Sequence, residues 1–330
     1  MTLRRTKVTA IIAFCLMALA ALWAARDRKP QPEKITIGVA VQPVSAPVYI
    51  AYEKGFFKKE GLQVTMRNYW AGKDALQAVM EEKAQFCTVA ETPIMFAGLK
   101  HEPIAVVATI ADSRRYMKMI ARKDRGIAGP GDLRGKRIAV SLGTNAQYYL
   151  DVYLMFFGVP RSSVRVVPLA PEKIADALAH GGIDAAVSWE PHLERQQNML
   201  GVNGLVLENE IIYELYWNIA ARQDYAATHA DAVKKLLRAL LRAQQYMEQH
   251  PQDAHDITAR YVGVSQFDLA DFNFDVRLPQ SLILSLEEQA RWAVRSGLAG
   301  ADEVPNFLRL VYTSGLESVA PDAVNLPVKR

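Results

Sequence analysis

The chain has 330 residues, half of which are hydrophobic, and this length and composition suffice for two domains with cores of their own. Its formal net charge of +4 comes from the N-terminal end, because the first 34 residues hold seven of the 39 Lys and Arg residues and two of the 35 Asp and Glu residues. The remainder is close to neutral, which excludes a basic body that would bind nucleic acid.

The first segment has the layout of a secretory signal. Arg4, Arg5 and Lys7 precede an uncharged, mainly apolar run over residues 8–25, which ends in small residues. This run is at the lower limit of what spans a bilayer as a helix, so a cleaved signal peptide and a retained anchor both remain open. We expect residues 1–34 to be a signal peptide or signal anchor, the protein to be exported to the periplasm, and membrane contact to be confined to this segment.

Two similar units follow, and each alternates strand and helix. In residues 35–91, the stretches ITIGVAV, LQVTMRNYW and FCTVAE are typical of strands, and helical patterns lie between them. Residues 137–190 repeat that order with RIAVSL, VRVVPLA and IDAAVSW. Alternating strands and helices require parallel strands covered on both faces, so the sequence predicts an α/β protein built of two βαβ-type lobes.

Two further strand-like segments, near residues 116–122 and 215–222, are predicted to cross between the lobes as a hinge. The first lobe then contains residues 35–118 and 222–330, and the second contains residues 119–221. The rest is helical. Residues 232–249 place apolar side chains on one stripe, and Ser285 with Glu288 has the capping-box pattern of a helix that begins near residue 286.

Four stretches carry a family resemblance: APVYIAYEKGFFKKEGLQV from residue 46, DLRGKRIAVSLGT from residue 132, IADALAHGGIDAAVSWEPH from residue 174 and QSLILSLEEQARWAV from residue 280. In this order they resemble the nitrate, taurine and aliphatic-sulfonate binding proteins of ABC importers. That group shares the type II periplasmic binding fold with binders of thiamine-pyrimidine precursors. The resemblance covers about residues 35–325 and implies a type II periplasmic binding protein fold, with two βαβ-built lobes joined by two hinge strands.

The resemblance also implies a function. We expect the substrate-binding protein of an ABC transporter, an extracytoplasmic component that captures a small organic anion or zwitterion of the sulfonate, taurine or nitrate type by lobe closure. Its partners would be the small-molecule ligand and the permease and ATPase of the importer, with no nucleic acid. The protein itself is expected to be a monomer, and the identity of the ligand stays open.

Ligands of open α/β sheets bind beyond the carboxyl ends of the strands, so the candidate ligand-binding residues follow the predicted strands or flank the crossings. These candidates are Gln42, Ser45, Trp70, Lys73, Glu91, Thr92, Arg114, Gly143, Thr144, Asn145, Trp189, Glu190 and Tyr216. For Gln42 and Ser45 the assignment comes from the resemblance, and a rigid turn bracketed by prolines is the alternative.

Several candidates have a structural alternative. The stretch 143–145 opens a helix, whose free amides and dipole favour an anion, yet Thr144 and Gln147 also form a capping box that needs no ligand. Lys73 can counter a ligand anion or be a solvated charge. Arg114 can clamp an anion with its planar guanidinium or form a salt bridge at the rim of the site.

Glu91 and Glu190 occupy matching positions at the ends of the third strands of the two units. A buried carboxylate needs a partner, which can be an amine or amide of the ligand or a donor of the protein. Two carboxylates in the cleft fit a purely anionic ligand such as nitrate poorly. The aromatic residues that could wall a ligand, or belong to the core, are Tyr116, Tyr148, Tyr216 and Trp217.

No catalytic motif or clustered set of metal ligands is recognisable, so we expect no enzyme, no cofactor and no metal site. The six histidines are scattered, and Cys87 lies in an apolar run typical of a buried, inert thiol. Two alternatives remain. One is a solute-binding sensor or accessory module tethered to the membrane, and the other is an enzyme on the same fold, as in pyrimidine synthases and menaquinone-pathway lyases.

Overall fold

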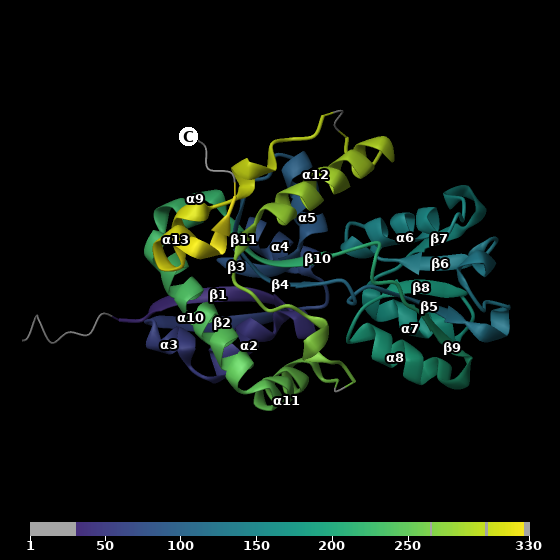
Figure 1. Ribbon diagram of the computed structural model, residues 1–330, viewed down its shortest axis with the longest axis horizontal. Helices are drawn as coiled ribbons and strands as arrows, with labels where there is room; N and C mark the ends of the chain where they lie inside the picture. Colours follow the sequence, from purple (N-terminus) through teal and green to yellow (C-terminus); the bar gives the residue numbers. More distant parts are fainter. Residues whose placement is uncertain (1–30, 265, 301–302, 327–330) are drawn as a thin grey trace, which may run out of the picture. The chain divides into compact units, whose positions relative to one another are not determined.

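Two five-stranded mixed sheets form the framework of the computed structural model, which describes residues 31–264, 266–300 and 303–326 (Figure 1). The first sheet has the strand order β2-β1-β3-β10-β4. Its strands are β1 (Glu33–Ala40), β2 (Leu62–Tyr69), β3 (Phe86–Ala90), β4 (Ile104–Ser113) and β10 (Leu215–Arg222). β1 and β3 are parallel, whereas β10 runs antiparallel to both β3 and β4.

The second sheet has the order β7-β6-β8-β5-β9. Its strands are β5 (Lys118–Arg122), β6 (Arg137–Val140), β7 (Arg165–Pro168), β8 (Ala185–Ser188) and β9 (Gly204–Leu207). β6 is parallel to β7 and β8, and β5 is antiparallel to β8 and β9. The order β2-β1-β3 in one sheet corresponds to β7-β6-β8 in the other, so the predicted duplication of a βαβαβ unit is present.

Helices follow the strands as the alternation predicts. On the first sheet they are α2 (Ala46–Glu53), α3 (Phe56–Lys59), α4 (Gly72–Met80) and α5 (Glu91–Leu99), and on the second they are α6 (Asn145–Phe156), α7 (Pro171–Ala179) and α8 (His192–Leu200). All residues of β3 and β4 are buried, because strands covered on both faces expose neither set of alternating side chains.

The chain passes between the sheets twice. It leaves the first sheet after Ser113 and enters the second at Lys118, and it returns between Leu207 and Leu215. The whole of β10 pairs with β3 and β4, so residues 215–221 belong to the first sheet, whereas the sequence-based boundary had grouped them with the second lobe. The connecting residues are therefore 114–117 and 208–214, outside the strands.

The C-terminal part is helical, with α9 (Gln223–Thr228), α10 (Ala230–Gln249), α11 (Pro251–Val262), α12 (Gln280–Arg295) and α13 (Thr313–Val319), and two short strands, β11 (Leu278–Pro279) and β12 (Val324–Asn325). The predicted apolar stripe of α10 is confirmed, since Val233, Leu236 and Leu240 are buried. The predicted helix start at Ser285 is wrong. α12 begins at Gln280, and Ser285 lies inside it and accepts a hydrogen bond from Gln289.

Among the described residues, no helix combines the length and the apolarity that crossing a membrane requires. The predicted signal segment lies outside the described residues up to residue 30.

The close packing of α5 against residues 307–310 can be tested directly. A Cβ atom added at Gly98 of α5 would lie 2.7 Å from a ring carbon of Phe307 and 2.9 Å from a methyl group of Leu310. We expect Gly98→Ala to lower the free energy of unfolding by about 1–3 kcal/mol through overpacking, measured by urea denaturation. Gly129→Ala is the control, because its Cβ would meet no atom within 4 Å. Equal stability of the two variants would contradict this packing.

Candidate functional site

Residues from the ends of both sheets meet around Tyr116, which lies in the first connection. Its hydroxyl donates a 2.5 Å hydrogen bond to Gln42 Oε1 after β1 and lies 3.5 Å from the backbone oxygen of Glu190 after β8. The rings of Trp70, after β2, and His192, at the start of α8, have centroids 5.9 Å apart. We call Gln42, Trp70, Tyr116, Glu190 and His192 the interface cluster. It brings together three of the predicted site residues from the carboxyl ends of parallel strands, where ligands of such sheets bind.

The centre of the interface cluster is buried and neutral at pH 7. Gln42 and Tyr116 are almost inaccessible, and burial raises the pKa of the Tyr116 hydroxyl well above its ordinary value. Burial lowers the pKa of His192 to about 4, although a hydrogen bond with the Trp70 backbone opposes this shift. Trp70 itself remains 56% exposed, so its indole offers a free face beside the neutral imidazole.

A run of buried polar atoms without partners begins at the last residue of β8. Within the described part of the chain, no hydrogen bond is made by Ser188 Oγ, Trp189 Nε1, His192 Nε2 or either amide atom of Gln196. His192 and Gln196 are one helical turn apart on α8 and thus share a face. Buried polar groups are nearly always satisfied in proteins, so these atoms of residues 188–196, which are closed to solvent, are donors and acceptors that still lack a partner.

The predicted candidate Glu91 is satisfied by the protein itself. Its carboxylate, fully buried at the start of α5, accepts hydrogen bonds from the Tyr213 hydroxyl, from the Tyr216 backbone amide at 3.0 Å and from Gln289 Nε2 at 2.9 Å. Burial raises its pKa, and the three donors oppose that effect. Thr92 Oγ1 bonds Gln289 Oε1 at 2.6 Å. These groups connect α5, α12 and the second connection, which is a structural role.

Ser45 is also engaged by protein groups. Its hydroxyl is fully buried, donates to the backbone oxygen of Ala40 at 2.9 Å and accepts from Trp217 Nε1 at 3.0 Å. The predicted aromatic wall residue Tyr148 packs edge-on against Trp292, with ring centroids 5.2 Å apart. Of the four predicted wall residues, Tyr116 belongs to the interface cluster.

Thr144 caps the start of α6, but the predicted capping box is not formed, because Gln147 accepts from the amide of Gly143 and not from that of Thr144. Thr144 Oγ1 accepts from the Ala146 amide at 3.2 Å, and Gln147 Oε1 accepts from the Gly143 amide at 2.8 Å. Gly143 has φ of 73°, a conformation that favours glycine. Asn145 Nδ2 lies 3.2 Å from Met117 Sδ in the first connection. The amides that a free anion would use at this helix start are thus partly engaged.

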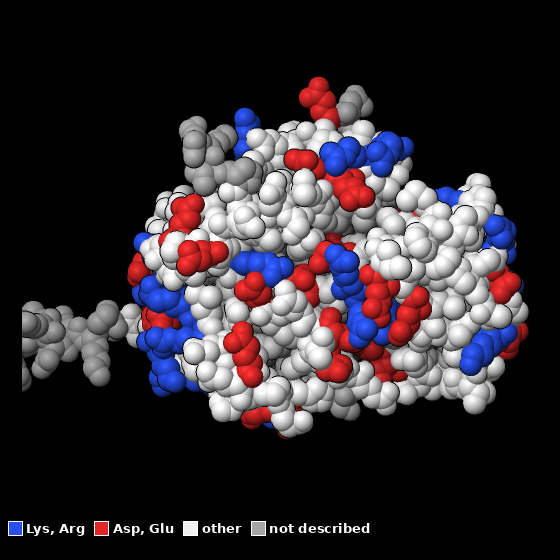
Figure 2. All heavy atoms as spheres, viewed as in Figure 1, with Lys and Arg blue, Asp and Glu red and all other residues white. Residues whose placement is uncertain are grey.

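The predicted basic candidates lie at the edge of the site. Lys73 Nζ donates to the Leu142 backbone oxygen at 3.0 Å and so links α4 to the loop after β6. Arg114 pairs with Glu214 at 3.2 Å with its side chain 64% exposed, which is the rim salt bridge considered as its alternative. On the face seen in Figure 2, Lys and Arg side chains lie next to acidic ones without forming one extended basic patch.

Glu190 differs from Glu91 although the two hold matching positions. Its Oε2 accepts a 3.0 Å hydrogen bond from the Glu194 amide, and it has no ion-pair partner among the described residues. Burial raises its pKa from the ordinary 4.5 to about 7. The hydrogen bond from the Glu194 amide opposes this shift, the Glu194 carboxylate adds to it, and the Lys118 ammonium opposes it. This carboxyl group can therefore exchange a proton or receive a donor near neutral pH.

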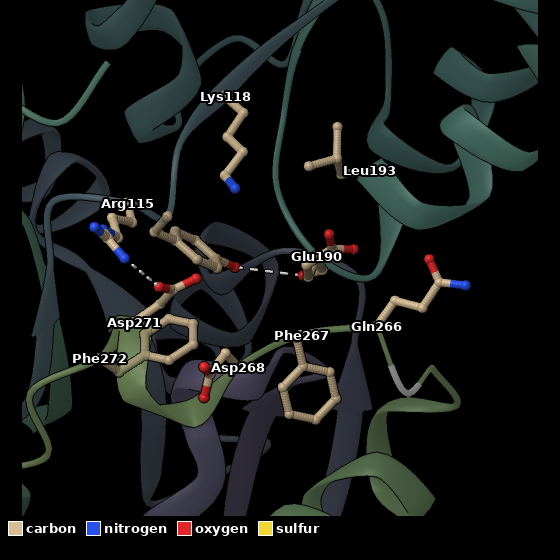
Figure 3. A pocket seen from close by; sticks show the side chains of 10 residues that line it. Arg115, Lys118, Glu190, Leu193, Gln266, Phe267, Asp268, Asp271 and Phe272 are labelled. Atoms are coloured by element: carbon tan, nitrogen blue, oxygen red, sulfur yellow. Dashed lines mark hydrogen bonds and ion pairs between the residues drawn. The ribbon is translucent and has the colours of Figure 1, made fainter. Parts of the chain in front are cut away.

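A cavity of about 390 Å³ adjoins Tyr116 and Glu190 (Figure 3). Its lining comprises Arg115, Tyr116, Lys118, Glu190, Leu193, Gln266, Phe267, Asp268, Asp271 and Phe272. His192, Gln196 and the lining residues from Gln266 to Phe272 were not predicted from the sequence. The position of His192 directly after a strand end was a usable signal, whereas the segment after α11 carried none.

Comparisons with known proteins identify the family of the chain. A sequence model of the family described as NMT1/THI5 like matches residues 42–254. The putative aliphatic sulfonates-binding protein of Bacillus subtilis is 26% identical over 255 residues, which cover 76% of each chain. The taurine-binding periplasmic protein of Escherichia coli is 28% identical over 223 residues, which cover 65% of this chain and 67% of that protein.

Solved structures confirm the periplasmic binding protein fold. The alkanesulfonate-binding protein SsuA from Xanthomonas axonopodis pv. citri bound to MOPS has a TM-score of 0.75 at 17% identity, covering 87% of this chain and 100% of that one. The desulfurization enzyme DSZB also matches, with a TM-score of 0.66 at 16% identity, covering 88% and 99%. The fold alone thus does not separate binding proteins from enzymes.

The buried Glu91 network predicts a large stability effect. Glu91→Ala removes the acceptor of Tyr213, Tyr216 and Gln289 and leaves three buried donors unpaired, so we expect the free energy of unfolding to fall by about 2–5 kcal/mol. Glu91→Gln, which keeps one acceptor oxygen, should lose less. Urea denaturation measures both, with Glu317→Ala at an exposed position of α13 as the control. A loss under 1 kcal/mol for Glu91→Ala would disprove the structural role.

The raised pKa of Glu190 predicts a pH dependence of stability. The fold favours the protonated form, so this stabilisation is full below pH 4.5 and is lost as pH rises to about 7. Relative to Glu190→Gln, the free energy of unfolding of the natural protein should fall by about 1–3 kcal/mol between pH 4.5 and 8. Urea denaturation across this range measures it, with exposed Glu317→Gln as the control. Parallel profiles for the natural protein and Glu190→Gln would contradict the shift.

Proposed function

Because the chain belongs to the NMT1/THI5-like family, we propose that it is the extracytoplasmic solute-binding component of an ABC importer and captures a small organic anion or zwitterion. The observation that carries this proposal is the position of Tyr116. This residue of the first connection contacts Gln42 from one sheet and Glu190 from the other. A solute bound beside it would touch both halves of the molecule at once.

The proposed mechanism is a clamp. The first lobe would contain residues 34–113 and 215–326 around the first sheet, and the second would contain residues 118–207 around the second sheet. The connections 114–117 and 208–214 would act as the hinge. A solute favours closure only through contacts that it makes better in the closed state, and the interface cluster supplies side chains from both lobes for such contacts.

Recognition would use neutral groups for the polar part of the solute. Trp189 Nε1 can donate to a sulfonate or carboxylate oxygen, and Gln196 can donate or accept, since neither has a partner among the described residues. The exposed face of Trp70 can cover an apolar or planar part of the solute. Glu190 would receive a donor such as an amine, as the matching carboxylates in the sequence suggested.

Partners and location follow from the relatives. The relatives named above are binding proteins, one of them periplasmic, which supports delivery to a permease and its ATPase after export directed by residues 1–34. We favour binding over catalysis because Cys87 is fully buried and burial raises its pKa, so the described residues offer no reactive thiolate.

The direct test is a thermal-shift screen of the purified protein against alkanesulfonates, taurine, nitrate, bicarbonate, aromatic acids and thiamine-pyrimidine precursors. A solute at 100 times its Kd should stabilise the native state by about 2.7 kcal/mol and raise the Tm saturably. Trp70→Ala should weaken binding of the solute found by about 3- to 10-fold in calorimetry. Tyr52→Ala, a comparably exposed aromatic outside the cluster, is the matched control.

Two outcomes would count against the proposal. If no solute of the panel raised the Tm saturably, these classes of solute would be excluded as ligands. Equal affinities of Trp70→Ala and the natural protein, with a solute that does bind, would place the binding site away from the interface cluster.

A further inference from the structure

The cavity beside the interface cluster has walls from three separate segments. Tyr116 and Lys118 come from the first connection and β5, Glu190 and Leu193 come from the end of β8 and from α8, and Phe267 to Phe272 come from the loop after α11. Its volume of about 390 Å³ is within the range of small-molecule sites. Since Tyr116 and Glu190 belong to both, the cavity is an extension of the proposed binding site.

The cations that line the cavity already have carboxylate partners. Arg115 pairs with Glu210 at 2.9 Å and with Asp271 at 3.2 Å. Lys118 Nζ pairs with Glu208 at 2.8 Å. An anionic group entering the cavity would therefore have to displace one of these carboxylates.

Two carboxyl groups that line the cavity have no such partner among the described residues. Glu190 accepts a hydrogen bond from the Glu194 backbone amide at 3.0 Å, and Asp268 accepts one from the Ala270 backbone amide at 2.8 Å. Backbone amides orient these carboxyl groups without neutralising them. The cavity lining thus has two carboxyl groups without an ion-pair partner, whereas both of its basic side chains are paired.

Aromatic rings complete the lining. Phe272 lies 5.8 Å from the ring of Tyr116, measured between centroids, and Phe267 lines the same cavity. In Figure 3 the Asp268 carboxylate is seen between the rings of Phe267 and Phe272. Ring faces attract cations through their quadrupole, most strongly where water is excluded.

We propose that this cavity receives a protonated or quaternary amine group of the bound solute, held by Asp268 and Glu190 and by the rings of Tyr116, Phe267 and Phe272. The solute is then an organic amine, such as a zwitterion whose anionic part lies at residues 188–196, and not a plain monoanion. This inference rests on the proposed function, because the cavity opens beside the same cluster. Phe267, Asp268 and Phe272 become specificity determinants supplied by the loop after α11.

The test compares solutes that have the same shape but differ in charge. The full chain is titrated by calorimetry with N,N,N-trimethyltaurine and its uncharged-head isostere 3,3-dimethylbutane-1-sulfonate, and with choline and 3,3-dimethylbutan-1-ol. Taurine and ethanesulfonate serve as the smaller pair. If either solute of a pair binds to the protein, we expect the solute with the ammonium group to bind at least about 10-fold more tightly than the other.

Variants then locate the preference. Asp268→Asn and Phe272→Leu should each reduce the preference for the ammonium member by about 3- to 10-fold, while Asp322→Asn, exposed and outside the cavity lining, should leave it unchanged. Circular dichroism and the Tm verify that each variant is folded.

The outcomes separate this inference from the proposed function. Equal or tighter binding of the uncharged-head members would overturn the amine site and leave solute binding intact. An ammonium preference that persists in both Asp268→Asn and Phe272→Leu would place the amine elsewhere and also overturn it. Failure of all six solutes, together with the wider screen, would count against both proposals.

Discussion

The insertion of β10 between β3 and β4 is the constraint on which the rest of the structure depends. β10 pairs with both neighbours along its length and is almost wholly buried. Because it returns from the second sheet and runs antiparallel, it ties that sheet to the first by a second covalent connection. A βαβαβ unit joined by one connection would leave the relative placement of the two sheets to surface contacts alone. With two connections, Tyr116 and Tyr213 are placed where the sheet ends meet. Tyr116 contacts the Gln42 side chain and the Glu190 backbone oxygen, and Tyr213 contacts the side chains of Glu91 and Tyr149.

The two connections use their tyrosines differently. Tyr213 donates to the fully buried Glu91 carboxylate, whose other donors come from β10 and α12. A buried charge surrounded by donors is costly to disturb, so this side of the molecule resists change. Tyr116 contacts the neutral Gln42 and the Glu190 backbone, and Glu190 belongs to the stretch 188–196 that holds unpaired polar atoms. Unpaired polar atoms also occur on the Tyr213 side, since the hydroxyl of Tyr149, whose ring packs edge-on against Tyr213, makes no hydrogen bond among the described residues.

The charged side chains near the site also differ in whether they have partners. The guanidinium and ammonium groups near the site are mostly paired at exposed positions, where ion pairs contribute little to stability but cancel the field that would attract a simple anion. The carboxyl groups of Glu190 and Asp268 keep an uncompensated acceptor capacity beside aromatic rings. A solute that carries both an amine and an anionic or polar end would satisfy this pattern better than nitrate, an expectation that the two cleft carboxylates had raised from sequence.

The sequence by itself determined the two strand-helix units, the order of their elements and the helix start at Thr144, because each depends on hydrophobic periodicity or on residues within one helical turn. It also placed Gln42, Trp70 and Glu190 at strand ends, where parallel strands bring ligand contacts together. It could not distinguish Glu91 from Glu190, since the two occupy equivalent positions and the donors that satisfy Glu91 lie 122 to 198 residues away along the chain. Nor could it assign Asp268 to the site, because that loop reaches Tyr116 and Glu190 only when both sheets are assembled. Local patterns set which elements form, whereas the partners of a polar group depend on side chains that long-range packing brings next to it.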